Sequence, residues 1–249
     1  DMDFPTAPCI SEAIRARAGH ALYGYTRPPR ELNEVVADRF RERYGTPIET
    51  GWIHWVPGVV PALSAACLAF ADEGDEVVIL TPVYPPFRTL PGRVGRAVRE
   101  VPLKRERGRW TPDADAFRAA LTPRTRLFFL CQPHNPVGRV FTRDELTPLF
   151  ELCLERDIRI VSDDIHCDLI LDDMPHRPIL GWSKELAEHS LTLMSPGKTF
   201  NTAGLNTALA VIPDPASRTA YRRVCETLLP HPNPIGLEAA LAAYRDGEA

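Results

Sequence analysis

Short apolar runs alternate with segments of helical periodicity along this chain, and that alternation constrains its fold more than any other feature. Runs at Glu76–Leu80, Arg126–Leu130 and Ile158–Val161 have the length of buried strands. Between such runs lie segments like 31–44, in which apolar residues recur at helical spacing. The alternation predicts an α/β domain with a mostly parallel central sheet.

The other elements follow the same rhythm. Thr142 and Glu145 have the spacing of a capping box and mark the start of a helix. The proline-rich segment 81–86 predicts a rigid loop, and the basic segment 104–110 predicts a hairpin or loop. Further strands are expected at Ile53–Val56, Arg96–Val101, Leu191–Met194 and Leu209–Ile212, and further helices near Ile10–Ala18, from Val59 to about Ala71, at Asp113–Leu121, up to about Glu155 and in the last 30 residues.

Composition narrows the functional classes. With 249 residues, 44% of them apolar and 25% charged, the chain predicts a soluble globular protein with an ample core. A net charge of -4 argues against nucleic acid and membrane surfaces as partners, and no apolar run is long enough to span a bilayer. The six scattered cysteines lack zinc spacing and predict free thiols in a reducing cytoplasm, with no metal site. A start at Asp1 rather than methionine predicts a sequence that begins partway into a longer protein.

Polar residues follow five of the predicted strands. They are Gly58-Val59, Tyr84, Asn135, Asp163 and Lys198, each just beyond the end of an apolar run. In open parallel sheets, ligands bind beyond the carboxyl ends of the strands. The sequence therefore predicts that five loops converge on one crevice. It contains neither G-x-G-x-x-G nor a P-loop, which disfavours dinucleotides and nucleoside triphosphates.

Lys198 lies in a loop of small and polar residues, 195–201, directly after the strand 191–194. A lysine at the end of a buried strand loses solvation, which favours the neutral amine that forms a Schiff base. Ser, Gly, Thr and Asn in the same loop offer donors to an anion. The alternative interpretation is a solvated lysine in an ordinary turn.

The other strand-end residues match what a Schiff-base lysine needs if its partner is pyridoxal 5'-phosphate (PLP). Asp163 can keep the ring nitrogen protonated, and Asn135 can donate to the phenolic oxygen. Tyr84 can stack on the ring. Backbone N–H groups of 58–60 at a helix start can bind the phosphate, with the Ser195 hydroxyl added. Taken singly, each is more simply a cap, a turn residue or packing; together they predict one cofactor site.

The chain resembles fold-type I PLP enzymes of the class I/II aminotransferase superfamily. Within them it is most similar to the cystathionine β-lyase (C–S lyase) subfamily of MalY/PatB type, and the resemblance covers essentially all of the chain. The motifs that carry it are DMDF at 1–4, YGYT at 23–26, PGVVPAL at 57–63, TPVYPPF at 81–87, HNPVGR at 134–139, SDDIHCDLIL at 162–171 and SPGKTFNTAGLNT at 195–207.

The resemblance implies a role for each matching residue. Lys198 is the Schiff-base lysine and the general base, Asp163 pairs with the pyridine nitrogen, and Asn135 contacts the phenolic oxygen. Tyr84 is the stacking aromatic. The remaining implied cofactor contacts are Val59, Val60, Ser195, His166 and, from a neighbouring subunit, Tyr23. Tyr84 or Tyr23 is the candidate that positions the substrate or protonates the leaving sulfur.

The chain departs from the general aminotransferase pattern at three positions, and two of them separate the subfamilies. General aminotransferases carry an Arg eight residues after the lysine and a Tyr three residues after the aspartate; here these positions are Asn206 and His166. Both residues are the choice of the C–S lyases. Asp164 stands where Glu is commoner. The resemblance therefore implies β-elimination from an S-substituted cysteine, with an aminotransferase on the same fold as the alternative.

The resemblance also implies the organisation of the domains. Residues 1–30 are expected to form an irregular N-terminal segment and 31–249 the three-layer PLP-binding large domain, with the small C-terminal domain and its carboxylate-binding Arg largely missing. A homodimer acting on a small amino-acid substrate is implied. Other hypotheses are a non-catalytic PLP-binding regulatory domain, a catalytically inactive scaffold and a domain of a larger biosynthetic enzyme.

Overall fold

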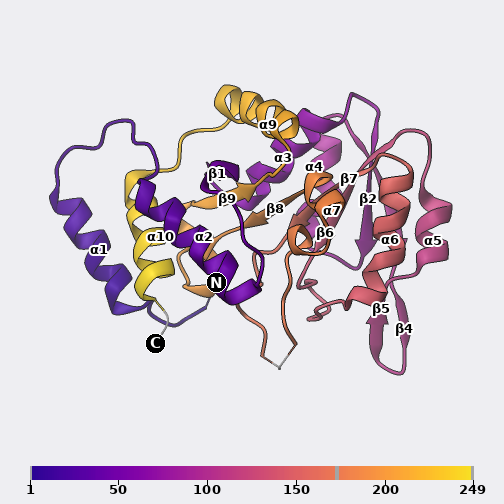
Figure 1. The fold of residues 1–249 in the computed structure, drawn as a ribbon, viewed down its shortest axis with the longest axis horizontal. Coiled ribbons are helices and arrows are strands. Elements are labelled where there is room, and N and C mark those ends of the chain that lie inside the picture. The colour runs from indigo at the N-terminus through magenta and orange to yellow at the C-terminus, as the bar shows by residue number, and fades with distance from the viewer. Residues whose placement is uncertain (1, 172–173, 248–249) are drawn as a thin grey trace.

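A seven-stranded sheet forms the centre of the protein in the computed structural model, which describes residues 2–171 and 174–247 (Figure 1). The strand order is β1-β9-β8-β7-β6-β2-β3. Only β9 pairs antiparallel with its neighbours, so β1, β8 and the rest of the sheet run in one direction. The strands are β1 Ile53–Val56, β2 Glu76–Thr81, β3 Ala97–Pro102, β6 Thr125–Cys131, β7 Arg159–Asp163, β8 Ser190–Met194 and β9 Ala208–Val211, and a separate hairpin joins β4 Lys104–Glu106 to β5 Arg109–Thr111.

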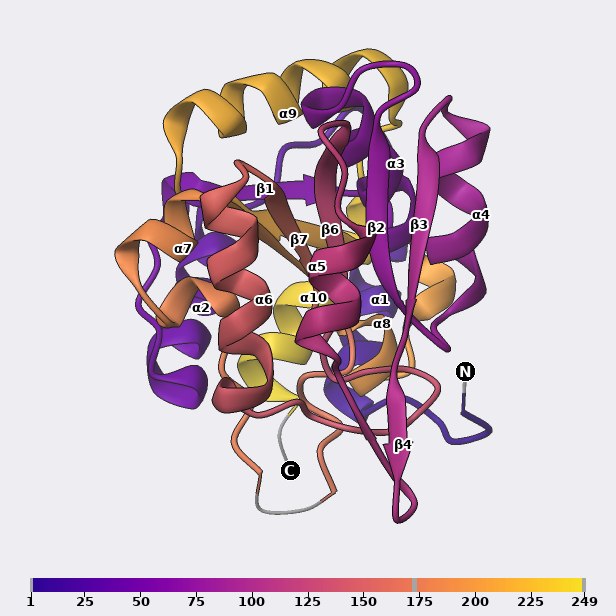
Figure 2. The same cartoon turned by 90° about the vertical axis from the view of Figure 1, so that its right-hand side faces the viewer.

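Both faces of the sheet are buried under helices, which makes three layers (Figures 1 and 2). Val78 and Leu80 of β2 belong to the core cluster that includes residues of α2, α5, α6, α7 and α10, whereas Val77 and Ile79 belong to the cluster that includes residues of α3, α4 and α9. Strands buried on both faces read as continuous apolar runs, which is how they were recognisable. The helices are α1 Pro8–Gly19, α2 Arg30–Tyr44, α3 Val59–Phe70, α4 Pro85–Arg93, α5 Ala114–Ala120, α6 Arg143–Glu155, α7 Lys184–Glu188, α8 Pro196–Thr199, α9 Pro215–Leu228 and α10 Pro234–Asp246, with 3₁₀ turns at Thr50–Trp52, Ile179–Gly181 and Ala203–Leu205.

The α/β class, the mostly parallel sheet and the predicted strands are confirmed. The capping box is present too: Glu145 N–H donates to Thr142 Oγ1 (3.4 Å), and Thr142 N–H donates to Glu145 Oε2 (2.8 Å). One segment differs from the prediction. The predicted rigid loop ends at Tyr84, and α4 begins at Pro85, because proline in a first helical turn lacks only an N–H that would have no partner.

Helix α1 lies beside α10 at one end of the molecule (Figure 1). Ile10 is fully buried there against Ala239, Ala243 and Phe200. The division between residues 1–30 and the rest stays a prediction, but α1 has an apolar contact of its own with the last helix.

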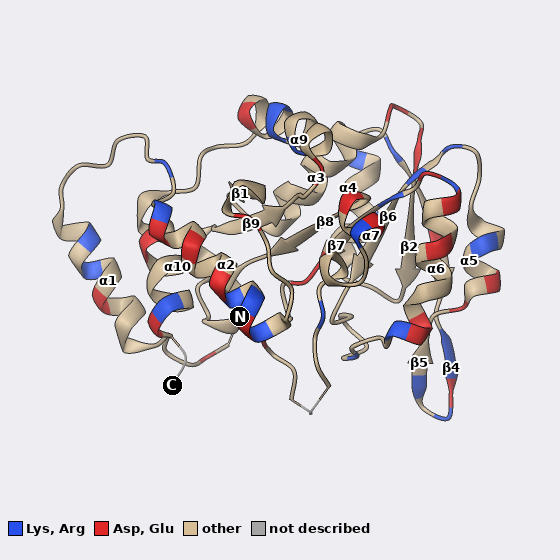
Figure 3. Ribbon diagram, in the orientation of Figure 1, with Lys and Arg blue, Asp and Glu red and all other residues tan. Residues whose placement is uncertain are grey.

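Charged residues lie mainly on the helices and on the β4–β5 hairpin, while the strands of the central sheet carry few (Figure 3). Within residues 2–171 and 174–247, no helix is long and apolar enough to cross a membrane. Within the same ranges, no group of three or more His, Cys, Asp or Glu side chains could hold a metal ion.

Candidate active site

A cavity of about 290 Å³ lies at the carboxyl ends of the parallel strands. Loops that follow β1, β2, β6, β7 and β8 all contribute to its wall, as the shared strand direction requires. The lining residues are Met2, Val59, Val60, Tyr84, Cys131, Asn135, Asp163, Ile165, His166, Leu169, Gly197, Lys198 and Asn201.

Lys198 reaches this cavity from α8, a single helical turn rather than an irregular loop. Ser195 caps the turn by accepting from Gly197 N–H (3.0 Å), and its hydroxyl donates to Thr207 O (2.8 Å). A Cβ at Gly197 would lie 3.0 Å from Ser195 Oγ and 3.2 Å from Ala203 Cα. A side chain at this position would therefore crowd its neighbours in the turn that carries the lysine.

Asp163 is the last residue of β7 and is 4% exposed. Its Oδ1 accepts from Ile165 N–H (3.1 Å). Burial raises the pKa of its carboxyl to about 7, and the neighbouring Asp164 adds to that rise, whereas the Ile165 N–H and Lys198 oppose it. A buried carboxyl with so little local stabilisation favours a cationic partner from outside the chain.

Tyr84 and Asn135 come from different loops that are bonded to each other. Tyr84 N–H donates to Asn135 O (3.1 Å), and His134 Nε2 lies 2.9 Å from Pro82 O. Burial lowers the pKa of His134, so this ring is neutral and serves as a fixed bridge between the two loops. Tyr84 is 40% exposed and lines the cavity. An aromatic side chain and an amide are thus held side by side at one wall.

Helix α3 begins at Val59, with Gly58 as its N-cap residue. The N–H groups of Val59 and Val60 fall in the first turn, where no carbonyl of the helix can accept from them. Both residues line the cavity. Free N–H groups and the positive end of the helix dipole suit an anion such as a phosphate.

His166 follows Asp163 by one turn of chain and lines the same cavity. Burial, and then the charge of Lys198, lower the pKa of this imidazole. A neutral ring beside a lysine can donate or accept a hydrogen bond at a ligand without adding charge.

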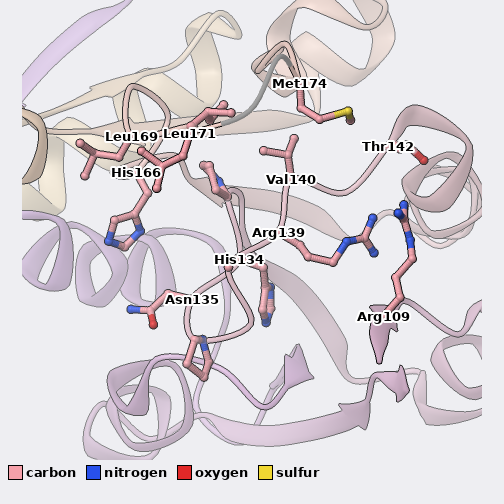
Figure 4. Close-up of a pocket in the computed structure, with 14 residues that line it drawn as sticks. Arg109, His134, Asn135, Arg139, Val140, Thr142, His166, Leu169, Leu171 and Met174 are labelled. Carbon is pink, nitrogen blue, oxygen red and sulfur yellow. The ribbon is translucent and has the colours of Figure 1, made fainter. Parts of the chain in front are cut away.

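A second cavity of about 560 Å³ adjoins the first and shares Asn135, His166 and Leu169 with it (Figure 4). Arg139 and Arg109 lie together at its far end. Both guanidinium groups pair with Glu145, at 3.0 Å and 3.4 Å respectively. The two guanidinium groups at the far end are therefore both paired with one carboxylate of α6.

Two of the residues chosen from the sequence do not line the first cavity. The Ser195 hydroxyl caps α8 by accepting from Gly197 N–H, and it donates to Thr207 O. Tyr23 is 57% exposed, and its hydroxyl donates to Ala18 O (2.5 Å) beside α1. The structure thus brings together Lys198, Asp163, Asn135, Tyr84, Val59, Val60 and His166 only. The roles of Ser195 and Tyr23 at a cofactor stay predictions.

Sequence reasoning missed several wall residues. Cys131 ends β6 and Ile165 follows β7, so the strand-end rule could have found both. Asn201 was harder to foresee. It has a left-handed backbone (φ 53°), and its Nδ2 donates to Met2 O and Phe4 O, both at 2.7 Å. Asn201 thereby draws the DMDF motif to the lysine turn; Asp1 of that motif lies outside the described residues.

Comparison with known proteins identifies the family of this chain. The family model described as aminotransferase class I and II matches residues 1–249, and the chain belongs to this family. Among its relatives, cystathionine beta-lyase PatB of Bacillus subtilis (strain 168) is 38% identical over 99% of this chain and 64% of PatB. Protein MalY of Escherichia coli (strain K12) is 34% identical over 99% and 64%.

Among solved structures, cystalysin from Treponema denticola, which contains a pyridoxal 5'-phosphate cofactor, has a TM-score of 0.95 at 31% identity. The match covers 99% of this chain and 63% of cystalysin. The chain therefore spans somewhat less than two thirds of the length of these relatives.

Proposed function

We propose that this chain is the cofactor-binding part of a PLP-dependent carbon–sulfur lyase that cleaves an S-substituted cysteine to a thiol, pyruvate and ammonia. One observation carries the proposal: an amine, Lys198, and a buried carboxyl, Asp163, line one cavity with Tyr84 and Asn135. PatB, named as a cystathionine β-lyase, and cystalysin, which contains PLP, support the cofactor and the reaction.

The residues of the cavity fit PLP group by group. The Asp163 carboxyl, whose pKa burial raises to about 7, would gain a cationic partner in a protonated pyridine nitrogen. Asn135 and His166 would donate to the phenolic oxygen, and Tyr84 would cover a ring face. The N–H groups at the start of α3 would bind the phosphate.

PLP, when bound, supplies an electron sink for the negative charge that develops at the substrate Cα. Lys198 Nζ takes the proton from that Cα as general base. Asp163 keeps the ring nitrogen protonated by holding a negative charge next to it. Tyr84 or Tyr23 positions the substrate or donates the proton that the leaving sulfur receives.

Two positions favour lyase over transaminase. Asn206 stands where general aminotransferases place a phosphate-binding Arg, and it has a left-handed backbone (φ 49°) at the end of a 3₁₀ turn. His166 replaces the tyrosine beside the cofactor. Incubation with an S-alkyl cysteine and a keto acid separates the alternatives: pyruvate and free thiol support a lyase, a new amino acid supports an aminotransferase, and neither product supports a non-catalytic PLP-binding domain.

A homodimer fits this function, because Tyr23 lies on an exposed segment with Leu22 and Tyr25. In such a dimer Tyr23 would act at the neighbouring subunit's cofactor, and residues 1–30 would form the segment that carries it. Residues 31–249 would then form the large domain. Analytical ultracentrifugation tests the assembly, and loss of cofactor affinity in Tyr23→Phe tests the contact.

Lys198→Ala tests the proposal most directly. We expect no turnover and no visible absorbance of lysine-bound cofactor, because no other lysine lines the cavity described above. Lys184→Ala is the matched control, since Lys184 is 89% exposed and pairs with Glu188 on α7. Thiol release by Lys198→Ala at the rate of the unmodified chain would falsify the assignment.

A further inference from the structure

The segment that follows β7 has two sides. Asp163 and His166 line the cavity, whereas Asp164 and Cys167 are buried on the opposite side. A tight turn fixes this alternation, because Cys167 N–H donates to Asp164 O (2.9 Å). Any side chain that holds Asp164 therefore also sets the direction of Asp163, its neighbour along the chain.

Asp164 is a fully buried carboxylate with two side-chain donors. Ser162 Oγ donates to its Oδ1 (2.5 Å), and His176 Nε2 lies 2.8 Å from its Oδ2. A carboxylate only accepts, so His176 Nε2 carries the proton of this contact. The backbone is held as well, since Asp164 N–H donates to Leu193 O of β8 (2.8 Å).

His176 lies twelve residues further along the chain and is as inaccessible as its partner, with 2% of its side chain exposed. Its Nδ1 is buried and has no hydrogen-bond partner among the described residues. The edge of its ring meets Tyr44 of α2, with ring centroids 5.7 Å apart. A buried imidazole nitrogen without a partner costs free energy, and the contact of Nε2 with Asp164 opposes that cost.

The same side of the segment has a second anchor on α2. Tyr44 Oη donates to Asp168 Oδ1 (2.5 Å), and Arg39 pairs with Asp168 Oδ2 (2.8 Å). Asp168 therefore has its own cation. Asp164 depends on Ser162 and on the one ring of His176.

We infer that His176 is a positioning residue, which acts through Asp164 to fix the Asp163 carboxylate and to offset the charge behind it. The inference rests on the proposed function, because it gives Asp163 a cationic ring nitrogen to bind. Asp164 already contributes to the raised pKa of Asp163. Loss of the His176 proton donor would leave that neighbouring charge with Ser162 alone and would make Asp163 harder to ionise.

The groups that face these carboxyls come from several elements. Those around Asp163 are Lys198 of α8, Cys131 of β6 and His166 and Asp164 of its own segment. Those around Asp164, His176 and Asp168 are Ser162, Tyr44, Cys167, Arg39, Arg43 and Tyr244. Of these groups, the His176 ring bonds the Asp164 carboxylate through its Nε2.

The test is the pH dependence of PLP affinity, measured by titrating the cofactor-free chain. In His176→Leu we expect the acid limb of binding to move to higher pH, and affinity near neutrality to fall roughly threefold to tenfold. Asp164→Asn should move that limb to lower pH, because it removes the charge itself. His176→Gln keeps a donor and should restore most of the profile.

His189→Leu is the control, since this half-buried histidine lies at the start of β8, away from the cavity. Shifts of opposite sign in His176→Leu and Asp164→Asn support the inference, because a loss of stability alone moves both variants in one direction. Unchanged profiles in both, with PLP bound, overturn it and leave the proposed function intact. Failure of the unmodified chain to bind PLP overturns both. If His176→Leu does not fold, an unshifted profile in Asp164→Asn overturns the inference.

Discussion

Two buried carboxyl groups lie at opposite ends of the strands of the same sheet. Glu76 is the first residue of β2, at the amino ends of the parallel strands (the amino edge), and is 1% exposed. Asp163 is the last residue of β7, at their carboxyl ends (the carboxyl edge), and is 4% exposed. Both side chains are nearly inaccessible to solvent, but the hydrogen bond from half-exposed Arg99 lowers the pKa of Glu76 to about 2, whereas burial raises that of Asp163 to about 7. Burial by itself therefore does not decide the charge of a carboxyl in this protein.

Hydrogen-bond donors outweigh burial at Glu76, whereas burial outweighs them at Asp163. Glu76 accepts from Arg99 Nη2 (2.6 Å), Thr122 Oγ1 (2.5 Å) and Thr125 Oγ1 (3.1 Å), and the Arg99 bond is the largest cause of its low pKa. Asp163 accepts from the Ile165 N–H, and the charge of Lys198 is only the last of the causes that act on its pKa. Donors within the chain satisfy Glu76, whereas the carboxyl of Asp163 faces the cavity that we propose as the cofactor site.

The sharpest contrast is in activity. Asp163→Asn should lower kcat/KM for thiol release by roughly 100-fold to 1,000-fold, the range that one electrostatic partner of a developing charge supplies. Glu76→Gln should leave kcat/KM within about twofold, because Glu76 lies at the other edge of the sheet. Steady-state kinetics with saturating PLP measures both. Equal losses in the two variants would show that the comparison is wrong.

Stability should show the reverse order. Glu76→Gln should lower the free energy of unfolding by about 2 kcal/mol at neutral pH, less than the full pKa shift implies because Arg99 is half exposed to solvent. The folded-state pKa of Glu76 is depressed, so its contribution is present above pH 4.5 and is lost as pH falls towards 2. Urea titrations should therefore show the two chains converging in acid. A difference that persists there contradicts the assignment.

Asp163 should affect the cofactor-free protein in the opposite sense. Its folded-state pKa is raised from 3.8 to about 7, so the folded chain holds the proton more tightly and stability falls as pH rises between these values. Asp163→Asn should remove that slope and raise the free energy of unfolding above pH 7 by on the order of 1–2 kcal/mol. Thermal unfolding across this pH range measures it, and a destabilised Asn variant at high pH would refute the raised pKa.

The smallest effect concerns Ser195. Loss of its cap in Ser195→Ala should cost about 1 kcal/mol of stability and change PLP affinity less than threefold. Ser64→Ala is the control, because Ser64 bonds only a carbonyl of its own helix (3.4 Å). A tenfold or larger loss of PLP affinity in Ser195→Ala would instead place its hydroxyl at the phosphate.

Much of the fold was predictable because its signals are local. Apolar runs gave the strands, and the Thr142–Glu145 spacing gave a helix start to the residue. The rule that ligands bind at the carboxyl ends of strands predicted from the sequence that Lys198, Asp163 and Asn135 line one crevice. Helix α4 escaped prediction because the prolines of 81–86 predicted a loop, yet Pro85 and Pro86 form the first turn of the helix.

The rest depended on contacts between distant segments. No local pattern pairs Asn201 with Met2, which lie 199 residues apart, or gives Glu76 its donors Arg99, Thr122 and Thr125. His176 is a lone histidine in a loop by sequence, and only packing shows it beside Asp164.

The sequence by itself determined the class of fold and the chemical types at the site, since strand periodicity and strand-end residues are properties of short stretches. The tertiary structure alone decided which carboxyl is satisfied and which is not. That outcome depends on how many donors the folded chain brings within hydrogen-bond distance of each buried oxygen. The sequence places both carboxyls at the ends of strands, and only the folded chain shows that Glu76 is bonded to Arg99 while Asp163 lines the cavity.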